Sequence, residues 1–158
     1  MCGINAILNA KQISSLESDI LKMNELIKHR GPDDQGAYVK GKHALGHTRL
    51  SILDLSKNGH QPMSKDDGIT MVFNGEIFNY IELREELLKL GHSFSTKTDS
   101  EVILAAFQEW GEECVTHFNG MWSFVILDEV KNRVFASRDR FGVKPFYFWR
   151  SNETWYIS

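Results

Sequence analysis

The spacing of apolar residues predicts three amphipathic helices, at residues 16–27, 79–90 and 98–110. In each segment apolar side chains recur at intervals of three or four residues, which gathers them on one face of a helix. A glycine follows shortly after each segment, as is common beyond a helix C-terminus. Each start carries a polar residue with glutamate three positions later, the spacing of a capping box: Ser14 with Glu17, Asn79 with Glu82, and Thr98 with Glu101.

Short apolar runs separated by turn residues predict the β-strands. The first covers residues 4–8, and a run at 69–73 is expected to stop at Asn74-Gly75, because Asn-Gly is a strong turn signal. Residues 30–36 indicate a polar turn. Further strands are expected at 37–39, 43–47, 121–127, 133–137, within 141–148, and at 154–158.

The order of these elements indicates the fold class. The runs at 121–127 and 133–137 are joined through residues 128–132, which predicts a hairpin. No series of parallel βαβ units is visible along the chain. We therefore expect an α+β fold with antiparallel sheets and helices packed outside them.

Length and composition narrow the class of protein. The 158 residues correspond to one domain, and the net charge of −3 provides no footprint for nucleic acid. Two cysteines do not make a disulfide framework and fit a reducing compartment. Without a secretory signal or an apolar run of ~18 residues, we expect a cytoplasmic protein that does not enter membranes. Because the chain stops inside the strand at 154–158, we expect residues 1–158 to be the front domain of a longer protein.

The chain begins Met1-Cys2-Gly3-Ile4, which places a thiol directly ahead of the first predicted strand. If Met1 is removed, Cys2 carries a thiol and a free α-amine, and the amine can act as general base for its own nucleophile. Free α-amines titrate near pKa ~7.7–8.0, so a fraction is unprotonated at neutral pH. The simpler interpretation is that Cys2 is a small buried hydrophobic residue, as most cysteines are.

A thiolate that attacks a carbonyl carbon creates an oxyanion, which requires fixed hydrogen-bond donors. Asn74 can offer its side-chain amide and Gly75 its backbone N–H, with glycine allowing close approach. The alternative is an ordinary hairpin turn. Residues 76–79 lead into a helix rather than a second strand, which weakens that alternative.

Two charged residues can bind the ends of an amino-acid substrate. Arg49 can hold a carboxylate through two parallel N–H bonds, or it can form a surface or structural ion pair. Asp99 can hold an ammonium group, and it can also serve as an acid in the first turn of a helix. The six histidines lack zinc-site spacing and the glycines form no phosphate loop, so no metal or cofactor site is predicted. Cys114 lies in an apolar stretch and is expected to be buried.

Several short motifs occur together, in one order, along nearly the whole chain. With them the chain resembles the glutaminase domain of class II glutamine amidotransferases, and most closely that of glutamine-hydrolysing asparagine synthetases. Each motif is weak alone, whereas their combination is specific. The motifs lie at residues 1–4, 29–33, 46–52, 59–63, 73–80, 98–103 and 138–145.

This resemblance implies an N-terminal-nucleophile hydrolase fold, a four-layer αββα sandwich with two antiparallel sheets. It implies that Cys2 is the nucleophile and that Asn74 and Gly75 form the oxyanion hole. It also implies that Arg49 binds the α-carboxylate of glutamine and Asp99 the α-ammonium group. The residues expected to line the glutamine pocket are Arg49, Leu50, Ser51, Ile52, Leu53, Asn74, Gly75 and Glu76.

The resemblance also implies partners for the domain. L-glutamine is the expected substrate, and the ammonia is expected to reach a C-terminal synthetase domain that converts aspartate to asparagine. ATP and magnesium are expected only in that domain, because no pyrophosphate-loop motif occurs in these residues. Three alternatives remain open: another ammonia acceptor such as a sugar, another amide substrate, and a non-catalytic regulatory module. A homo-oligomer is compatible with the sequence.

Overall fold

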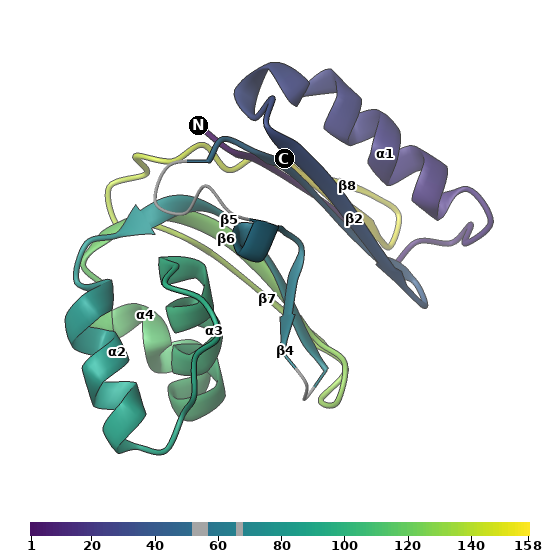
Figure 1. Ribbon diagram of the computed structural model, residues 1–158. Helices are drawn as coiled ribbons and strands as arrows, with labels where there is room; N and C mark the ends of the chain where they lie inside the picture. The colour runs from purple at the N-terminus through teal and green to yellow at the C-terminus, as the bar shows by residue number, and fades with distance from the viewer. Residues whose placement is uncertain (52–56, 66–67) are drawn as a thin grey trace.

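The computed structural model describes residues 1–51, 57–65 and 68–158. Two β-sheets lie face to face, and helices cover their outer faces (Figure 1). Helix α1 (Leu16–Leu26) covers the first sheet, whereas α2 (Tyr80–Lys89), α3 (Asp99–Trp110) and α4 (Cys114–His117) lie on the side of the second. This order of layers confirms the predicted αββα sandwich. Among the described helices none is long and apolar enough to cross a membrane.

The first sheet has the strand order β2-β3-β1-β9-β8, and the second has the order β4-β5-β6-β7. Every pairing between these named strands is antiparallel, which confirms the α+β class. The strands are β1 Gly3–Leu8, β2 Asp34–Lys40, β3 His43–Arg49, β4 Met63–Lys65, β5 Ile69–Ile77, β6 Gly120–Asp128, β7 Arg133–Arg138, β8 Phe148–Ser151 and β9 Thr154–Ile157. Three single-turn 3₁₀ helices complete the elements: η1 Lys28–Arg30, η2 Lys57–Gly59 and η3 Gly111–Glu113.

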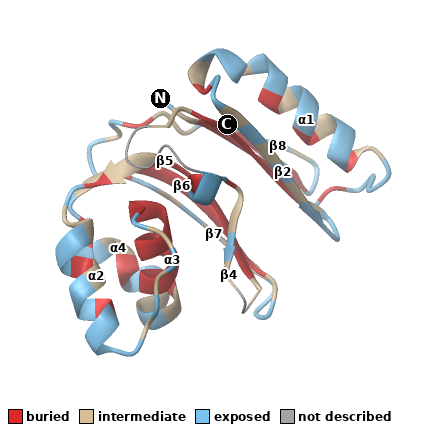
Figure 2. Ribbon diagram, viewed as in Figure 1, coloured by how far each residue is buried: buried red, intermediate tan, exposed pale blue. Residues whose placement is uncertain are grey.

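The apolar core is divided among three interfaces between layers. One cluster fills the space between the sheets, where Leu45 of β3 meets Val72 of β5 and Val125 of β6. A larger cluster joins the outer face of the second sheet to α2 and α3. A small cluster holds α1 on the first sheet through Leu16 and Ile20. Figure 2 shows the buried residues concentrated on the strands and on the inward faces of the helices.

All three predicted helices form, but only one of the predicted capping boxes does so, and only in part. The Thr98 hydroxyl accepts a hydrogen bond from Glu101 N, while the Glu101 carboxylate turns to residues 95 and 96. Helix α1 begins after Ser15, which makes no side-chain cap, so the cap predicted at Ser14 is wrong. Asn79 precedes α2, but its side chain pairs with the backbone of residues 117 and 119. Contacts with the end of α4 and with the residue before β6 replace the local cap at the start of α2.

Two predicted strand boundaries are wrong. β5 does not stop at Asn74-Gly75 but continues to Ile77, because both residues pair with β6, opposite Ser123 and Trp122. β2 begins at Asp34, inside the predicted polar turn, because that residue pairs with the end of β3. The predicted hairpin is confirmed as β6 and β7. Within residues 141–148 only Phe148 belongs to a strand.

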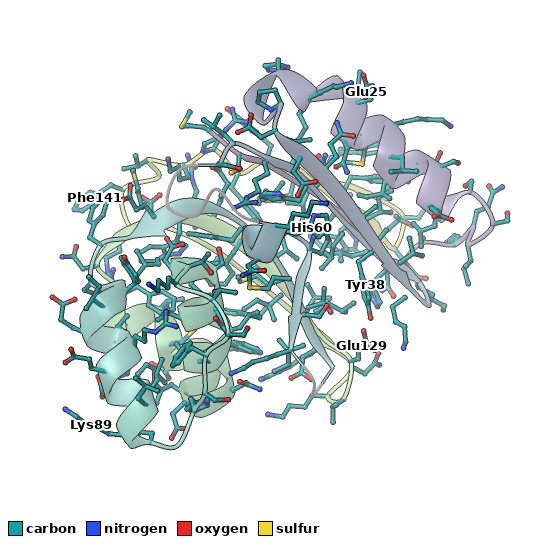
Figure 3. All side chains as sticks on the ribbon, viewed as in Figure 1. Glu25, Tyr38, His60, Lys89, Glu129 and Phe141 are labelled. Carbon is teal, nitrogen blue, oxygen red and sulfur yellow. The ribbon has the colours of Figure 1, made fainter. Side chains whose placement is uncertain are left out.

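Polar contacts join the two sheets at opposite ends. His47 in β3 is fully buried, and its Nε2 lies 3.1 Å from the carbonyl oxygen of Phe73 in β5. At the far end the Tyr38 hydroxyl of β2 donates to the Glu129 carboxylate beyond β6, and Lys40 pairs with the same carboxylate at 3.1 Å. Figure 3 shows Tyr38 and Glu129 facing each other across the sandwich. These contacts fix the position of β5 against β1 and β3.

Candidate functional site

Cys2 lies immediately before β1, where this strand begins beside the end of β3. The antiparallel register places Gly3 opposite Thr48, so residue 2 lies next to the chain that leaves β3. The Cys2 Sγ atom lies 3.6 Å from Leu50 O and 3.4 Å from Leu50 N. Arg30 of η1 donates from Nε to Cys2 O at 3.1 Å. The half-buried thiol is therefore held in one place by backbone contacts.

Asn74 and Gly75 lie side by side in β5 and not in a turn. Asn74 is 3% exposed and borders the cavity described below. A Cβ atom on Gly75 would lie 2.3 Å from Met121 O and 2.8 Å from Trp122 Cα. The neighbouring strand therefore leaves no room for a side chain at this position. A carboxamide beside a glycine N–H suits an oxyanion site.

Arg49 is the last residue of β3 and is 8% exposed. Its guanidinium packs against Gly59 of η2, where a Cβ atom would lie 2.1 Å from Nη2 and 2.7 Å from Cζ. The next residue, His60, holds this segment to β2, because its Nδ1 lies 2.6 Å from Asp34 Oδ2 (Figure 3). The close packing of Gly59 therefore limits the space in which the guanidinium can lie. An arginine fixed in this way can bind a carboxylate.

Asp99 is the first residue of α3 and is 4% exposed. Its Oδ2 accepts a hydrogen bond from Ile77 N at 3.0 Å, which joins the start of the helix to the end of β5. Burial, with a smaller contribution from the neighbouring Glu76 charge, raises the pKa of the Asp99 carboxyl to about 6. A substrate ammonium at this position would favour the charged carboxylate. Both readings of Asp99, as helix acid and as ligand, are compatible with this geometry.

These residues surround one cavity of about 330 Å³ between the sheets and the start of α3. The predicted site residues that line it are Cys2, Arg49, Leu50, Asn74, Gly75, Glu76 and Asp99. They come from four separate stretches of sequence, and they belong to both sheets and to the start of α3. A cavity of this size, with a thiol, two cations and two carboxylates on its wall, can hold a small zwitterionic molecule.

Not every predicted pocket residue is placed on this wall. Ser51 is described, but it does not line the cavity; its backbone N–H donates to Asp33 Oδ2 at 2.8 Å. Ile52 and Leu53 lie outside the described residues. The roles assigned to the seven lining residues stay predictions, and the structure adds that these residues meet at one cavity.

Sequence reasoning missed several lining residues, among them Gln61 and Lys144. The Gln61 side chain accepts from Phe73 N at 2.7 Å and reaches Ser100 Oγ at 3.4 Å, so it connects β5 with α3. Lys144 follows the charged residues 138–140 along the chain. Gln61 and Lys144 belong to motifs of the resemblance, at residues 59–63 and 138–145, and that signal could have identified them.

Comparison with known proteins agrees with this geometry. A relative from Methanocaldococcus jannaschii is 47% identical over 174 residues, covering 97% of this chain and 33% of the relative. Glutamine-hydrolysing asparagine synthetase 3 of Bacillus subtilis is 40% identical over 152 residues, covering 94% of this chain and 25% of that protein. The chain thus spans about a third or less of the length of these relatives.

The fold recurs in a solved structure of low sequence identity. Glutamine phosphoribosylpyrophosphate amidotransferase from Bacillus subtilis superposes with a TM-score of 0.76 at 18% identity, covering 99% of this chain and 41% of that one. This likeness shows the N-terminal-nucleophile hydrolase fold. The family described as "Glutamine amidotransferase domain" matches residues 1–158. From its first residue to its last, the chain belongs to the glutamine amidotransferase domain family.

Proposed function

We propose that this domain hydrolyses L-glutamine to glutamate and ammonia, with Cys2 as the nucleophile. The observation that carries the proposal is the single cavity that joins the Cys2 thiol to Asn74, Gly75, Arg49 and Asp99. Family membership supports it, because the residues expected for a glutaminase are those that meet there. Removal of Met1 is required, since only then does residue 2 carry a free amine. Met1 is 55% exposed and therefore accessible for removal.

The chemistry follows from the positions of these groups. The free Cys2 amine takes the thiol proton, and the thiolate attacks the side-chain carbonyl carbon of glutamine. The Asn74 carboxamide and the Gly75 N–H stabilise the tetrahedral oxyanion. The C–N bond then breaks, and the amine returns its proton to the departing ammonia. Water hydrolyses the remaining thioester to glutamate and restores the thiol.

Arg49 and Asp99 bind the two charged ends of the substrate and so set its distance from Cys2. One methylene group separates glutamine from asparagine, and an apolar pocket distinguishes such a difference by only ~1–3 kcal/mol. A fixed zwitterion site instead misplaces the shorter amide relative to the thiol. Selection for glutamine therefore depends on Arg49 being held by Gly59 and on Asp99 being held by Ile77 N.

The test begins with the intact mass, which should show that Met1 is absent from the purified protein. Glutamate release should then fall at least about a thousandfold in Cys2→Ala, as expected when a nucleophile is lost. Cys114→Ala is the matched control, because Cys114 is buried under α3 and far from the cavity wall. If Cys2→Ala releases glutamate at the parent rate, or if Met1 is retained in active protein, the proposal is wrong.

We further infer that the ammonia serves asparagine synthesis in the longer protein, with ATP and magnesium bound outside this domain. Support comes from the activity for which the relative from Bacillus subtilis is named. The test supplies the full-length protein with glutamine, ATP, magnesium and aspartate, and follows asparagine. Transfer of the glutamine nitrogen to a sugar or another acceptor, with none to aspartate, would refute this assignment and leave the glutaminase proposal intact.

A further inference from the structure

The loop at residues 139–145, which follows β7, is fixed by hydrogen bonds to two charged side chains. The Asp139 carboxylate accepts hydrogen bonds from four backbone N–H groups, and the Arg138 guanidinium donates to two backbone oxygens. The N–H donors to Asp139 belong to Trp122, Phe141, Val143 and Lys144, and the oxygens that Arg138 reaches are those of Gly142 and Lys144. So many contacts on one short segment mean that the position of Lys144 is set by the fold.

The Lys144 side chain is buried at the wall of the Cys2 cavity. The residue is 6% exposed, and its Nζ lies 3.5 Å from Met1 Sδ. Among the described residues no carboxylate lies within ion-pair distance of this ammonium. A thioether is only a weak acceptor, and a buried ammonium without a charge partner is costly. The fold therefore holds a cation beside residue 1, and no ion pair with a described residue offsets the cost of burying it.

We propose that Lys144 is a positioning residue whose ammonium, after Met1 is removed, keeps the Cys2 amine unprotonated at neutral pH, so that the amine is free to take the thiol proton. This inference rests on the proposed glutaminase function. A nearby cation disfavours a second positive charge and favours a negative one. The first effect increases the fraction of Cys2 that carries a free amine, and the second favours loss of the thiol proton to that amine.

The geometry supports this assignment because Lys144 contacts the residue that removal deletes. Consecutive Cα atoms are about 3.8 Å apart, so an ammonium in contact with the Met1 side chain lies within roughly 10 Å of the amine that Cys2 acquires. Over that distance inside a cavity wall, salt screens charges poorly. Loss of the Met1 side chain also removes the Sδ contact of this ammonium.

Other charges face the same amine and must be compared with Lys144. The three arginines act in the same direction as Lys144, and the carboxylates act against it. The Lys144 ammonium differs from all of them because it touches residue 1 itself. These groups are Arg30 on η1, Arg49, Glu76 and Asp99 on the cavity wall, and Arg138 and Asp139 on the loop that carries Lys144.

The experiment compares two neutral variants, Lys144→Met and Lys144→Gln, with the charge-retaining Lys144→Arg in the full-length protein. The acid limb of kcat/KM for glutamine should move up by about half to one pH unit in both neutral variants. At pH 6.5 this corresponds to about a threefold to tenfold loss, which disappears above pH 9. Lys144→Arg should follow the parent profile within about twofold. A substrate-binding role would instead raise KM at every pH.

A second measurement does not require glutamine. The rate at which iodoacetamide alkylates Cys2, followed by peptide mass spectrometry, should show the same displacement along the pH axis. Cys114 will not interfere, because burial raises the pKa of its thiol to about 12. Superimposable pH profiles for parent and neutral variants overturn the inference. Absence of glutamine hydrolysis in the parent contradicts the proposed function instead, and the alkylation profiles still decide the role of Lys144.

Discussion

His47 gives the protein a pH-dependent stability that can be measured separately from activity. Its side chain is fully buried between the sheets, and burial lowers its pKa to about 4, from 6.5 for a free histidine. In the unfolded chain the imidazole protonates near pH 6.5, whereas in the folded protein it stays neutral until about pH 4. Its contribution to stability is therefore complete above pH 6.5 and is lost as the pH falls toward 4.

The size of this loss follows from the two pKa values. Between pH 7.5 and 4.5 the free energy of unfolding should fall by about 2.5 kcal/mol on account of His47. Asp99 acts in the opposite direction, because burial raises its pKa to about 6 from the 3.8 of a free carboxyl. As the pH falls, Asp99 is protonated in the folded protein at a higher pH than in the unfolded chain. It should therefore raise the free energy of unfolding by about 2 kcal/mol over the same interval. In the parent protein the two contributions nearly cancel.

Single substitutions should separate the two contributions. The free energy of unfolding of each protein is measured in urea at about pH 7.5 and at about pH 4.5. Over this fall in pH, the value for His47→Gln should rise by about 2.5 kcal/mol relative to the parent. Asp99→Asn should lose about 2 kcal/mol relative to the parent over the same range. His29→Gln is the control, since His29 is exposed and its replacement should leave the slope unchanged. If the free energies of unfolding of the parent and of His47→Gln change by the same amount between about pH 7.5 and 4.5, the reasoning is refuted, whatever their absolute values.

Two glycines of the cavity wall should respond differently to the same added methyl group. Gly59→Ala meets the guanidinium of Arg49 rather than a backbone atom, so stability should change by less than about 1 kcal/mol, while KM for glutamine rises about tenfold or more and kcat changes little. An unchanged KM would show that Arg49 does not bind substrate. In Gly75→Ala the added methyl group meets backbone atoms of Met121 and Trp122. The free energy of unfolding should therefore fall by about 1–3 kcal/mol, and kcat should fall about a hundredfold. Gly91→Ala, where no atom lies within 4 Å, should keep the parent kcat.

The elements that the sequence predicts well are those with local causes. The helices at 16–26 and 99–110 follow from the period of apolar residues, and the β6–β7 hairpin follows from two β-rich runs around a short polar turn. The caps at Ser14 and Asn79 fail because tertiary contacts compete with local ones. Asn79, for example, gains two hydrogen bonds to the segment after α4 instead of one to its own helix.

The error at Asn74-Gly75 has a different physical origin. The dipeptide is favourable in a turn because both residues tolerate positive φ, and local sequence carries no other information. In the structure both residues are extended, because β6 supplies a partner for each of them from more than 45 positions away. The glycine serves close approach of Met121 and Trp122, not a turn. The structure thus places the expected oxyanion donors on the cavity wall, although in a strand and not in the predicted turn.

Gln61 shows why the support of a site is harder to predict than its reactive groups. A thiol, a guanidinium and a carboxylate each indicate a type of chemistry, whereas a glutamine between a histidine and a proline has no distinctive pattern. Yet its amide joins Phe73 N, next to Asn74, to Ser100 Oγ, next to Asp99. The proposed oxyanion donor and the proposed ammonium ligand are therefore held at a fixed separation by a side chain that need not touch the reacting carbon. In a site that must distinguish two amides by one methylene, this separation determines specificity as much as the charged groups do.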